Sequence, residues 1–123
     1  MEHTKRLENR SNKRQVGSHY EQLAADYLIK NGVQILERNF RCSQGELDLI
    51  VRDGRYLVFI EVKYRTTVSK GEPLESVNLR KQQRIRNAAR YYLYQHRYGE
   101  DTPCRFDVIS ILDGEIRWIQ NAF

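Results

Sequence analysis

The sequence predicts an α/β domain with a mixed β-sheet flanked by helices. Three observations predict it: two segments with helical hydrophobic spacing, five segments with the apolar patterning of strands, and turn residues between them. The expected order of elements is α-β-β-β-α-β-β. At 123 residues the chain is long enough to bury a sizeable core within one domain.

The N-terminal segment divides into a charged arm and a first helix. Residues 1–16 hold five basic and two acidic residues, a net charge of +3, without hydrophobic periodicity, which predicts a flexible basic arm. Residues 17–123 then form a single domain. Ser18 is expected to cap the first helix, because Ser18-x-x-Glu21 matches a capping box, and Gly32 ends it. Apolar residues at helical spacing lie between them: Tyr20, Leu23, Ala24, Tyr27 and Leu28.

The remaining elements follow from strand and turn signals. Strands are expected at 33–41, 46–52, 56–65, 105–112 and 115–121, with tight turns at Asp53-Gly54 and Asp113-Gly114. A second helix runs from about Leu79 to about Tyr98 after an Asn78 cap. Its expected buried stripe is Ile85, Ala88, Ala89, Tyr92 and Leu93. Residues 66–78 form a long loop, and such a loop beside a candidate site often carries function.

Composition and charge narrow the classes of function. No apolar run approaches a membrane span, and no signal-peptide core follows the start, so we expect a cytoplasmic protein without a membrane role. Cys42 and Cys104 form no CxxC pair, which favours reduced thiols. The net charge is +5, and residues 79–98 contain six basic residues and no acid. Such segregated positive charge favours phosphate binding.

Acidic and basic residues interrupt an otherwise apolar strand in the stretch FIEVKYR, residues 59–65. Alternation places Glu61 and Lys63 on one face. A two-residue turn at Asp53-Gly54 would place Asp48 on the same face, as a diagonal neighbour of Glu61 with Cα atoms roughly 7–8 Å apart. Two carboxylates at that separation suit Mg²⁺, which takes oxygen ligands and keeps several waters. Spacing alone leaves a surface ion-pair ladder equally open.

The arrangement Asp-x12-Glu-x-Lys across a hairpin has the form of the PD-(D/E)xK nuclease motif. Several motifs, in order, then resemble the bacterial YraN family: GELDLI (45–50), FIEVKYR (59–65), KQQRIRNAA (81–89), CRFDV (104–108) and WIQNAF (118–123). That family is a group of predicted nucleases. It is similar to archaeal Holliday-junction resolvases and implies a restriction-endonuclease-like, resolvase-like core. The resemblance covers roughly residues 17–123.

The resemblance implies a catalytic site. Asp48, Glu61 and the backbone carbonyl of Val62 would hold Mg²⁺, with Mn²⁺ as a substitute, and Lys63 would assist the attacking water. Glu21 would lie near the metal, although the capping box gives it a structural alternative. The proline that often precedes the aspartate is absent, and Leu47 stands in its place.

Nucleic-acid contacts are expected from the second helix and the end of the third strand. The candidates are Arg65, Lys81, Gln82, Arg86 and Arg90. Helical spacing directs Lys81 toward the sheet edge and places Arg86 and Arg90 on an outer stripe, where a solvated helix face is the alternative. Arg105 and Asp107 share a strand face and are expected to pair structurally.

The leading hypothesis is a metal-dependent endonuclease that hydrolyses phosphodiester bonds in branched or structured nucleic acid, DNA rather than RNA. The likeness to resolvases implies a homodimer, because symmetric junction cleavage needs two sites. One alternative is a nucleic-acid-binding module without catalysis. Another is an adaptor in DNA processing that acts with a helicase-type partner.

Overall fold

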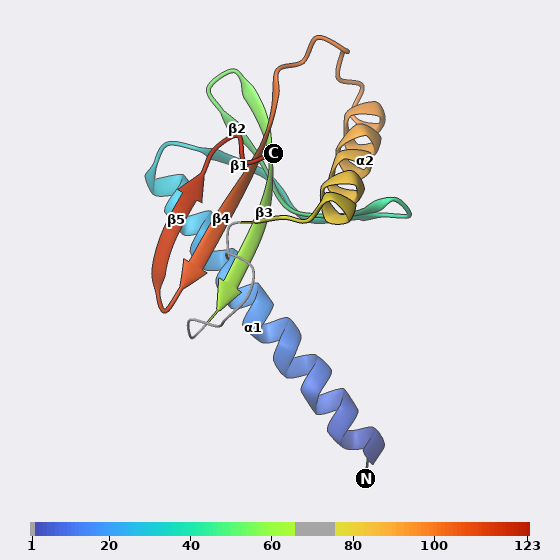
Figure 1. Cartoon of the computed structure of the whole chain (residues 1–123), viewed down its shortest axis with the longest axis vertical. Helices are drawn as coiled ribbons and strands as arrows, with labels where there is room; N and C mark the ends of the chain where they lie inside the picture. The colour runs from blue at the N-terminus through green and yellow to red at the C-terminus, as the bar shows by residue number, and fades with distance from the viewer. Residues whose placement is uncertain (1, 66–75) are drawn as a thin grey trace.

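The predicted order of elements is confirmed by the computed structural model, which describes residues 2–65 and 76–123, with side chains from residue 14 onward. The elements are α1 (Glu2–Lys30), β1 (Gln34–Cys42), β2 (Gly45–Asp53), β3 (Tyr56–Arg65), α2 (Leu79–Gln95), β4 (Cys104–Leu112) and β5 (Glu115–Ile119) (Figure 1). Most of the loop expected at 66–78 lies outside the described residues, so the expectation of a functional loop concerns residues that are not described.

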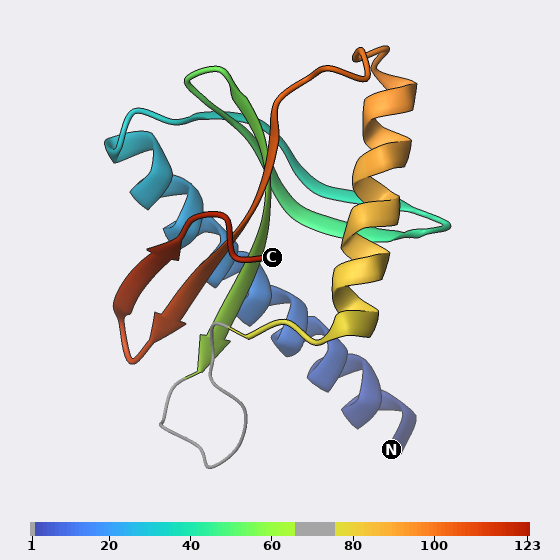
Figure 2. The ribbon, with the colours of Figure 1, turned by 45° about the horizontal axis from the view of Figure 1, so that its top comes forward.

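The five strands form one mixed sheet in the order β1-β2-β3-β4-β5. Only β3 and β4 run parallel; the other three neighbouring pairs are antiparallel. Helix α2 connects the two parallel strands, as a crossover connection requires. The helices α1 and α2 cover opposite faces of the sheet (Figure 2). The predicted mixed sheet flanked by helices is therefore confirmed.

Each face of the sheet has its own hydrophobic core. Against α1, the buried residues Ala24, Ala25 and Leu28 pack on strand residues that include Leu49 and Ile60. Against α2, the buried residues are Ile85, Ala88, Ala89 and Tyr92, as predicted, whereas Leu93 is only partly buried. Burial on both faces explains why β3 is an almost continuous apolar run, and it makes the buried Glu61 in that run conspicuous.

The start of α1 differs from the prediction. The helix begins at Glu2, so Ser18 lies inside it, and the expected Ser18 cap is wrong. Residues such as Lys, Arg, Glu and Leu are good helix formers, which allows the helix to continue through a segment that has no apolar stripe. The N-terminal half of α1 extends away from the sheet (Figure 1). Gly32 follows the helix with φ +82°, a conformation suited to glycine at a helix end.

The hairpin between β2 and β3 turns one residue later than predicted. Asp53 pairs with Tyr56, so the turn residues are Gly54 and Arg55, with Gly54 at φ +59°. A glycine in the first central position is typical of a type II′ turn. The pairing shifts by two residues relative to the prediction. Because side chains alternate with a period of two, every side chain keeps its predicted face.

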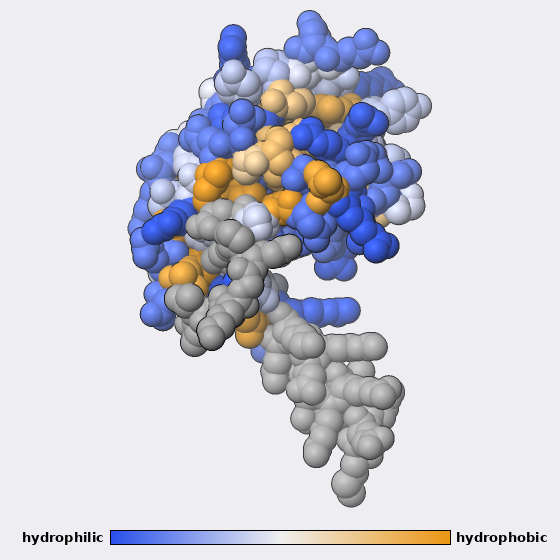
Figure 3. Space-filling view, in the orientation of Figure 1, coloured by the Kyte–Doolittle hydropathy of each residue, from blue (hydrophilic) through white to orange (hydrophobic). Residues whose placement is uncertain are grey.

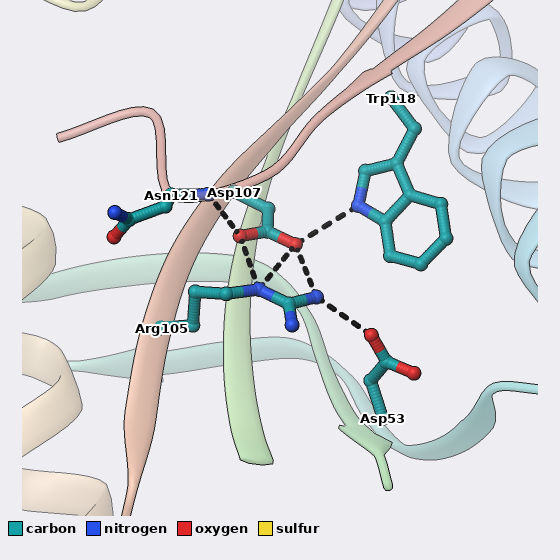
Figure 4. A network of polar contacts seen from close by, with 5 residues as sticks. All are labelled: Asp53, Arg105, Asp107, Trp118 and Asn121. Carbon is teal, nitrogen blue, oxygen red and sulfur yellow. Dashed lines mark hydrogen bonds and ion pairs between the residues drawn. The ribbon is translucent and has the colours of Figure 1, made fainter.

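A buried polar network ties the hairpin to the C-terminal strands (Figure 4). The Asp107 carboxylate is fully buried and accepts hydrogen bonds from the Arg105 guanidinium, the Trp118 indole N–H and the Asn121 backbone N–H. Arg105 also donates to Asp53 at 2.8 Å. The predicted structural pairing of Arg105 with Asp107 is confirmed. The bond to Asp53 also holds that residue in β2, which explains the displaced turn.

Candidate active site

Asp48 connects the two halves of the acidic motif. It lies on β2, and its Oδ2 accepts a hydrogen bond of 2.8 Å from the backbone N–H of Val62 on β3. The pairing of β2 with β3 extends from Asp53–Tyr56 to Leu49–Ile60, and continuing it by one residue places Asp48 opposite Glu61. The two acids are thus direct cross-strand neighbours rather than the diagonal neighbours that were predicted. As direct neighbours, the two acids lie closer together than the predicted diagonal pair would.

Glu61 lies at the centre of the site and is buried, with 7% of its side chain exposed. Its Oε1 is 2.5 Å from the ammonium of Lys81, which reaches it from the first turn of α2. The predicted direction of Lys81, toward the sheet edge, is therefore confirmed. A buried carboxylate requires a compensating cation, and Lys81 supplies one in this structure.

The Val62 carbonyl faces the same side as Asp48. In an extended strand the N–H and C=O of one residue point to the same edge, and the Val62 N–H points to β2. The backbone N–H and C=O groups of the odd-numbered residues in β3 point to the opposite edge, toward β4. There the Leu57 N–H donates to the Pro103 carbonyl, and the Arg65 carbonyl accepts from the Asp113 N–H. A Val62 oxygen on the side of Asp48 is in a suitable place for a third oxygen ligand.

Lys63 lies two residues beyond Glu61 on the same face of β3, near the C-terminal end of the strand. Its ammonium donates a hydrogen bond of 2.6 Å to the carbonyl of Ser76, two residues before the Asn78 cap. The Asn78 side chain accepts from the Lys81 N–H, as predicted for a helix cap. The segment before α2 therefore anchors both lysines of the site.

Glu21 on α1 lies near this cluster. Burial raises the pKa of Glu21; a hydrogen bond with Asn39 lowers it, and the charges of Glu46 and Glu61 raise it further. The capping role for Glu21 is wrong, because the residue lies in the interior of α1. Its proximity to the acids on β2 and β3 is the arrangement that the family resemblance implied.

Asn39 was not predicted as part of the site. It lies in β1 between the pairs Arg38–Leu49 and Phe40–Leu47, which places it beside Asp48. Its φ is +53°, an uncommon backbone conformation for a residue other than glycine, although asparagine tolerates it best. Strained backbone of this kind is often found at functional sites. In the sequence Asn39 stands in the mostly polar stretch 37–41, so no local signal singled it out.

The electrostatics of the cluster favour an added cation. Burial, followed by the charges of Glu61 and Glu21, raises the pKa of Asp48 to about 8, although the Val62 hydrogen bond and the Lys81 charge act in the opposite direction. For Lys81, burial lowers the pKa, but the hydrogen bond and charge of Glu61 outweigh it, so the pKa is raised. At Asp48 the Lys81 charge therefore does not offset the effect of burial and of the neighbouring acids.

The donors suit Mg²⁺ or Mn²⁺ better than a metal that needs many protein ligands. Within residues 2–65 and 76–123, no group of three or more His, Cys, Asp and Glu side chains has the arrangement of a ready-made metal site. Two carboxylates and one carbonyl are oxygen donors, and Mg²⁺ commonly takes one or two carboxylates and completes its shell with water. The residues Asp48, Glu61 and Val62 fit that requirement.

The expected nucleic-acid residues have different positions. Gln82 donates to the Val77 carbonyl at 2.8 Å, so its amide supports the start of α2. Arg86 is half-buried with its guanidinium over the rings of Phe106 and Phe123, at 4.7 and 5.6 Å. Its predicted place on the outer stripe is wrong, because the C-terminal tail folds back beside α2.

Arg90 and Arg65 complete the set of expected nucleic-acid residues. Arg90 is exposed on α2, as predicted, and Arg65 is half-buried at the end of β3. No helix among the described residues has the length and apolar character needed to cross a membrane.

Sequence comparison places the chain in a family. A profile described as "Uncharacterised protein family UPF0102" matches residues 20–111. The chain belongs to UPF0102. A UPF0102 protein of Lachnoclostridium phytofermentans is 54% identical over 112 residues, 91% of this chain and 95% of the relative. A UPF0102 protein of Aeromonas hydrophila is 49% identical over 87% of this chain and 83% of its own length. A UPF0102 protein of Legionella pneumophila is 46% identical over 87% of this chain and 92% of its own length. Membership of UPF0102 confirms the family that the motifs predicted.

Proposed function

We propose that this UPF0102 protein is a divalent-metal-dependent endonuclease with a restriction-endonuclease-like core, acting on branched or structured DNA. The observation that carries the proposal is the bond from the Val62 N–H to Asp48, which joins the separated aspartate to the Glu61-x-Lys63 segment. Buried acids without full charge compensation, together with an ammonium on the same face, support metal-assisted phosphodiester hydrolysis.

Each residue has a distinct role in this proposal. Asp48 and Glu61 would hold the metal with their carboxylate oxygens, helped by the carbonyl of Val62. A bound Mg²⁺ supplies Lewis-acid polarisation of the phosphoryl group and acidifies a coordinated water. Lys63 would orient the attacking water and stabilise the negative charge that develops on the phosphate. Glu21, at the edge of the cluster, would hydrogen-bond waters of the site.

The substrate is recognised by its backbone and shape in this proposal. The basic residues near the acids, Lys81 and the arginines of α2, suit phosphate contacts, and phosphate contacts carry no sequence information. The likeness to resolvases suggests branched DNA and a homodimer with two active sites. A protein that bound nucleic acid without cutting it, or that acted only with a helicase-type partner, would use the same basic residues.

The test is cleavage of labelled four-way junctions, flaps, duplex and single strands, with Mg²⁺, Mn²⁺ or EDTA. We expect cleavage with either metal, none with EDTA, and a loss of at least a hundredfold in Asp48→Asn, Glu61→Gln and Lys63→Met. Glu115→Gln is the control, since it removes an exposed carboxylate on β5, outside the candidate site, and should keep full cleavage. Binding of every substrate without cleavage would support the binding module instead, and cleavage retained in all three variants would disprove the proposed site.

A further inference from the structure

One face of α2 combines exposed positive charge with exposed aromatic rings. Residues three and four apart lie on one side of a helix, and the solvent side of α2 carries the set Arg80, Arg84, Asn87, Arg90, Tyr91 and Tyr94. All but the half-buried Asn87 are exposed. In Figure 3, hydrophilic residues cover most of the right-hand side of the molecule, where Figure 1 places α2. From its first to its last residue this stripe spans about 21 Å.

The two tyrosines of the stripe differ from the other tyrosine of the same helix. Tyr92 is buried and packs against Phe40 and Phe59. Tyr94 is 83% exposed and Tyr91 is 41% exposed. Neither of the two hydrophobic cores formed by the described residues includes Tyr94. An aromatic ring held in water on a rigid helix is available for stacking on a flat ligand.

The stripe begins at the candidate active site. Near its start, a hollow of about 470 Å³ is lined by Glu46, Asn78, Arg80, Lys81, Arg84 and Ile85. Lys81 in that hollow is the residue that contacts Glu61. Near its other end, a hollow of about 380 Å³ is lined by Gln44, Asn87, Arg90, Tyr91 and Tyr94. A ligand that lies along the stripe therefore extends from the acids toward the exposed tyrosines.

The position of α2 relative to the site is fixed by close contact. Gly45, the first residue of β2, lies so near α2 that a Cβ there would be 2.9 Å from the Arg84 carbonyl oxygen. Asp48 is three residues further along the same strand. The distance between the acids and the stripe is thus set by backbone packing. A ligand bound to the stripe would be held in a constant position relative to the acids.

We propose that this stripe binds a single-stranded segment of nucleic acid, with its phosphates on Arg80, Arg84 and Arg90 and an unpaired base stacked on Tyr94. The inference deepens the proposed function, on which its link to the acids rests, and names a substrate class: a structure with an unpaired strand next to the scissile phosphate. Between Leu79 and Gln95 the helix carries no acidic residue. Duplex bases are stacked on each other, whereas bases of a single strand are free to stack on aromatic side chains.

The test measures binding without cleavage. Fluorescence anisotropy in EDTA would compare a labelled 20-nucleotide oligothymidine with a 20-base-pair duplex. We expect Tyr94→Leu to weaken single-strand binding roughly tenfold and Tyr94→Phe to keep it, because stacking needs the ring and not the hydroxyl. Each of Arg80→Ala, Arg84→Ala and Arg90→Ala should flatten the slope of log affinity against log salt by about 0.7 for the single strand.

The controls separate this inference from the proposed endonuclease. Arg117→Ala removes an exposed arginine on β5, away from α2, and should leave the affinity unchanged. Asp48→Asn should abolish cleavage without loss of single-strand affinity. Equal single-strand affinity in Tyr94→Leu and the wild type, or an equal loss for the duplex, would overturn the stacking surface even if metal-dependent cleavage were found. Failure of the oligothymidine to bind at all would also overturn it and would favour a protein partner for this face.

Discussion

Asp48 is expected to make the metal-free protein less stable as the pH rises. Burial and neighbouring acids raise the pKa of Asp48 from 3.8 to about 8 in the folded chain. A carboxyl with a raised pKa binds its proton more tightly in the folded state than in the unfolded state. Its contribution to stability is therefore fully present below about pH 4 and is lost as the pH rises toward 8.

The magnitude follows from the size of the shift. Each pKa unit corresponds to about 1.4 kcal/mol, so a shift of this size corresponds to a loss of at most about 5 kcal/mol between pH 4 and pH 8. That loss is comparable to the whole stability of many small domains. The variant Asp48→Asn keeps an acceptor for the Val62 N–H but has no charge to bury. We expect it to be several kcal/mol more stable than the wild type at pH 8, with a difference that shrinks to about 1 kcal/mol at pH 4.5.

The assay is urea unfolding in EDTA, at intervals from pH 4.5 to pH 8.5, for both proteins. The difference between them isolates Asp48 from every other titrating group. Glu46→Gln serves as the control, because its carboxylate is exposed and its removal should give a small difference that varies little with pH. Parallel stability curves for the wild type and Asp48→Asn across this range would refute the electrostatic reasoning. Mg²⁺ at a concentration that saturates the wild type should raise the stability of the wild type at pH 8 and should stabilise the variant much less, because the variant binds the metal more weakly.

Three further predictions concern stability, measured by urea unfolding at pH 7. Asp107→Ala should lower the free energy of unfolding by about 3–5 kcal/mol, because it leaves the Arg105 guanidinium buried without its main partner. A loss of stability below about 1 kcal/mol would contradict the network. Asn39→Ala should be about 1 kcal/mol less stable than Asn39→Gly, since glycine accepts a positive φ, and the reverse order would contradict the strained strand. Asn78→Ala should lower the free energy of unfolding by about 1 kcal/mol, because Asn78 caps α2, whereas Ser18→Ala should leave it unchanged, because Ser18 lies inside α1. Equal losses in the two variants would indicate that a helix starts at residue 18.

The strand alternation of the sequence was sufficient to predict which residues share a face. Asp48, Glu61 and Lys63 were assigned to one face from a hairpin whose turn was misplaced by one residue. The error did no harm, because it shifted the pairing by two residues and left the alternation intact. The turn itself depends on Arg105, fifty-two residues away from Asp53, and local turn signals do not contain that contact.

Long-range packing accounts for the other differences. Helical spacing placed Arg86 on the solvent side, but the C-terminal tail returns to the sheet, with Ala122 N–H bonded to Phe106, and brings Phe123 against it. The left-handed backbone of Asn39 arises from its pairing between β1 and β2 and has no clear local signature. By contrast, the Asn78 cap and the Asp113-Gly114 turn were predicted correctly, since each depends on residues adjacent in the chain.

Binding of Mn²⁺, followed by electron paramagnetic resonance at pH 7.5, tests most directly whether strands β2 and β3 together form a metal centre. We predict one ion bound per chain in the wild type and binding at least tenfold weaker in both Asp48→Asn and Glu61→Gln. Wild-type affinity for Mn²⁺ in a protein that carries both substitutions would contradict the account, since the ion would then be held by other residues.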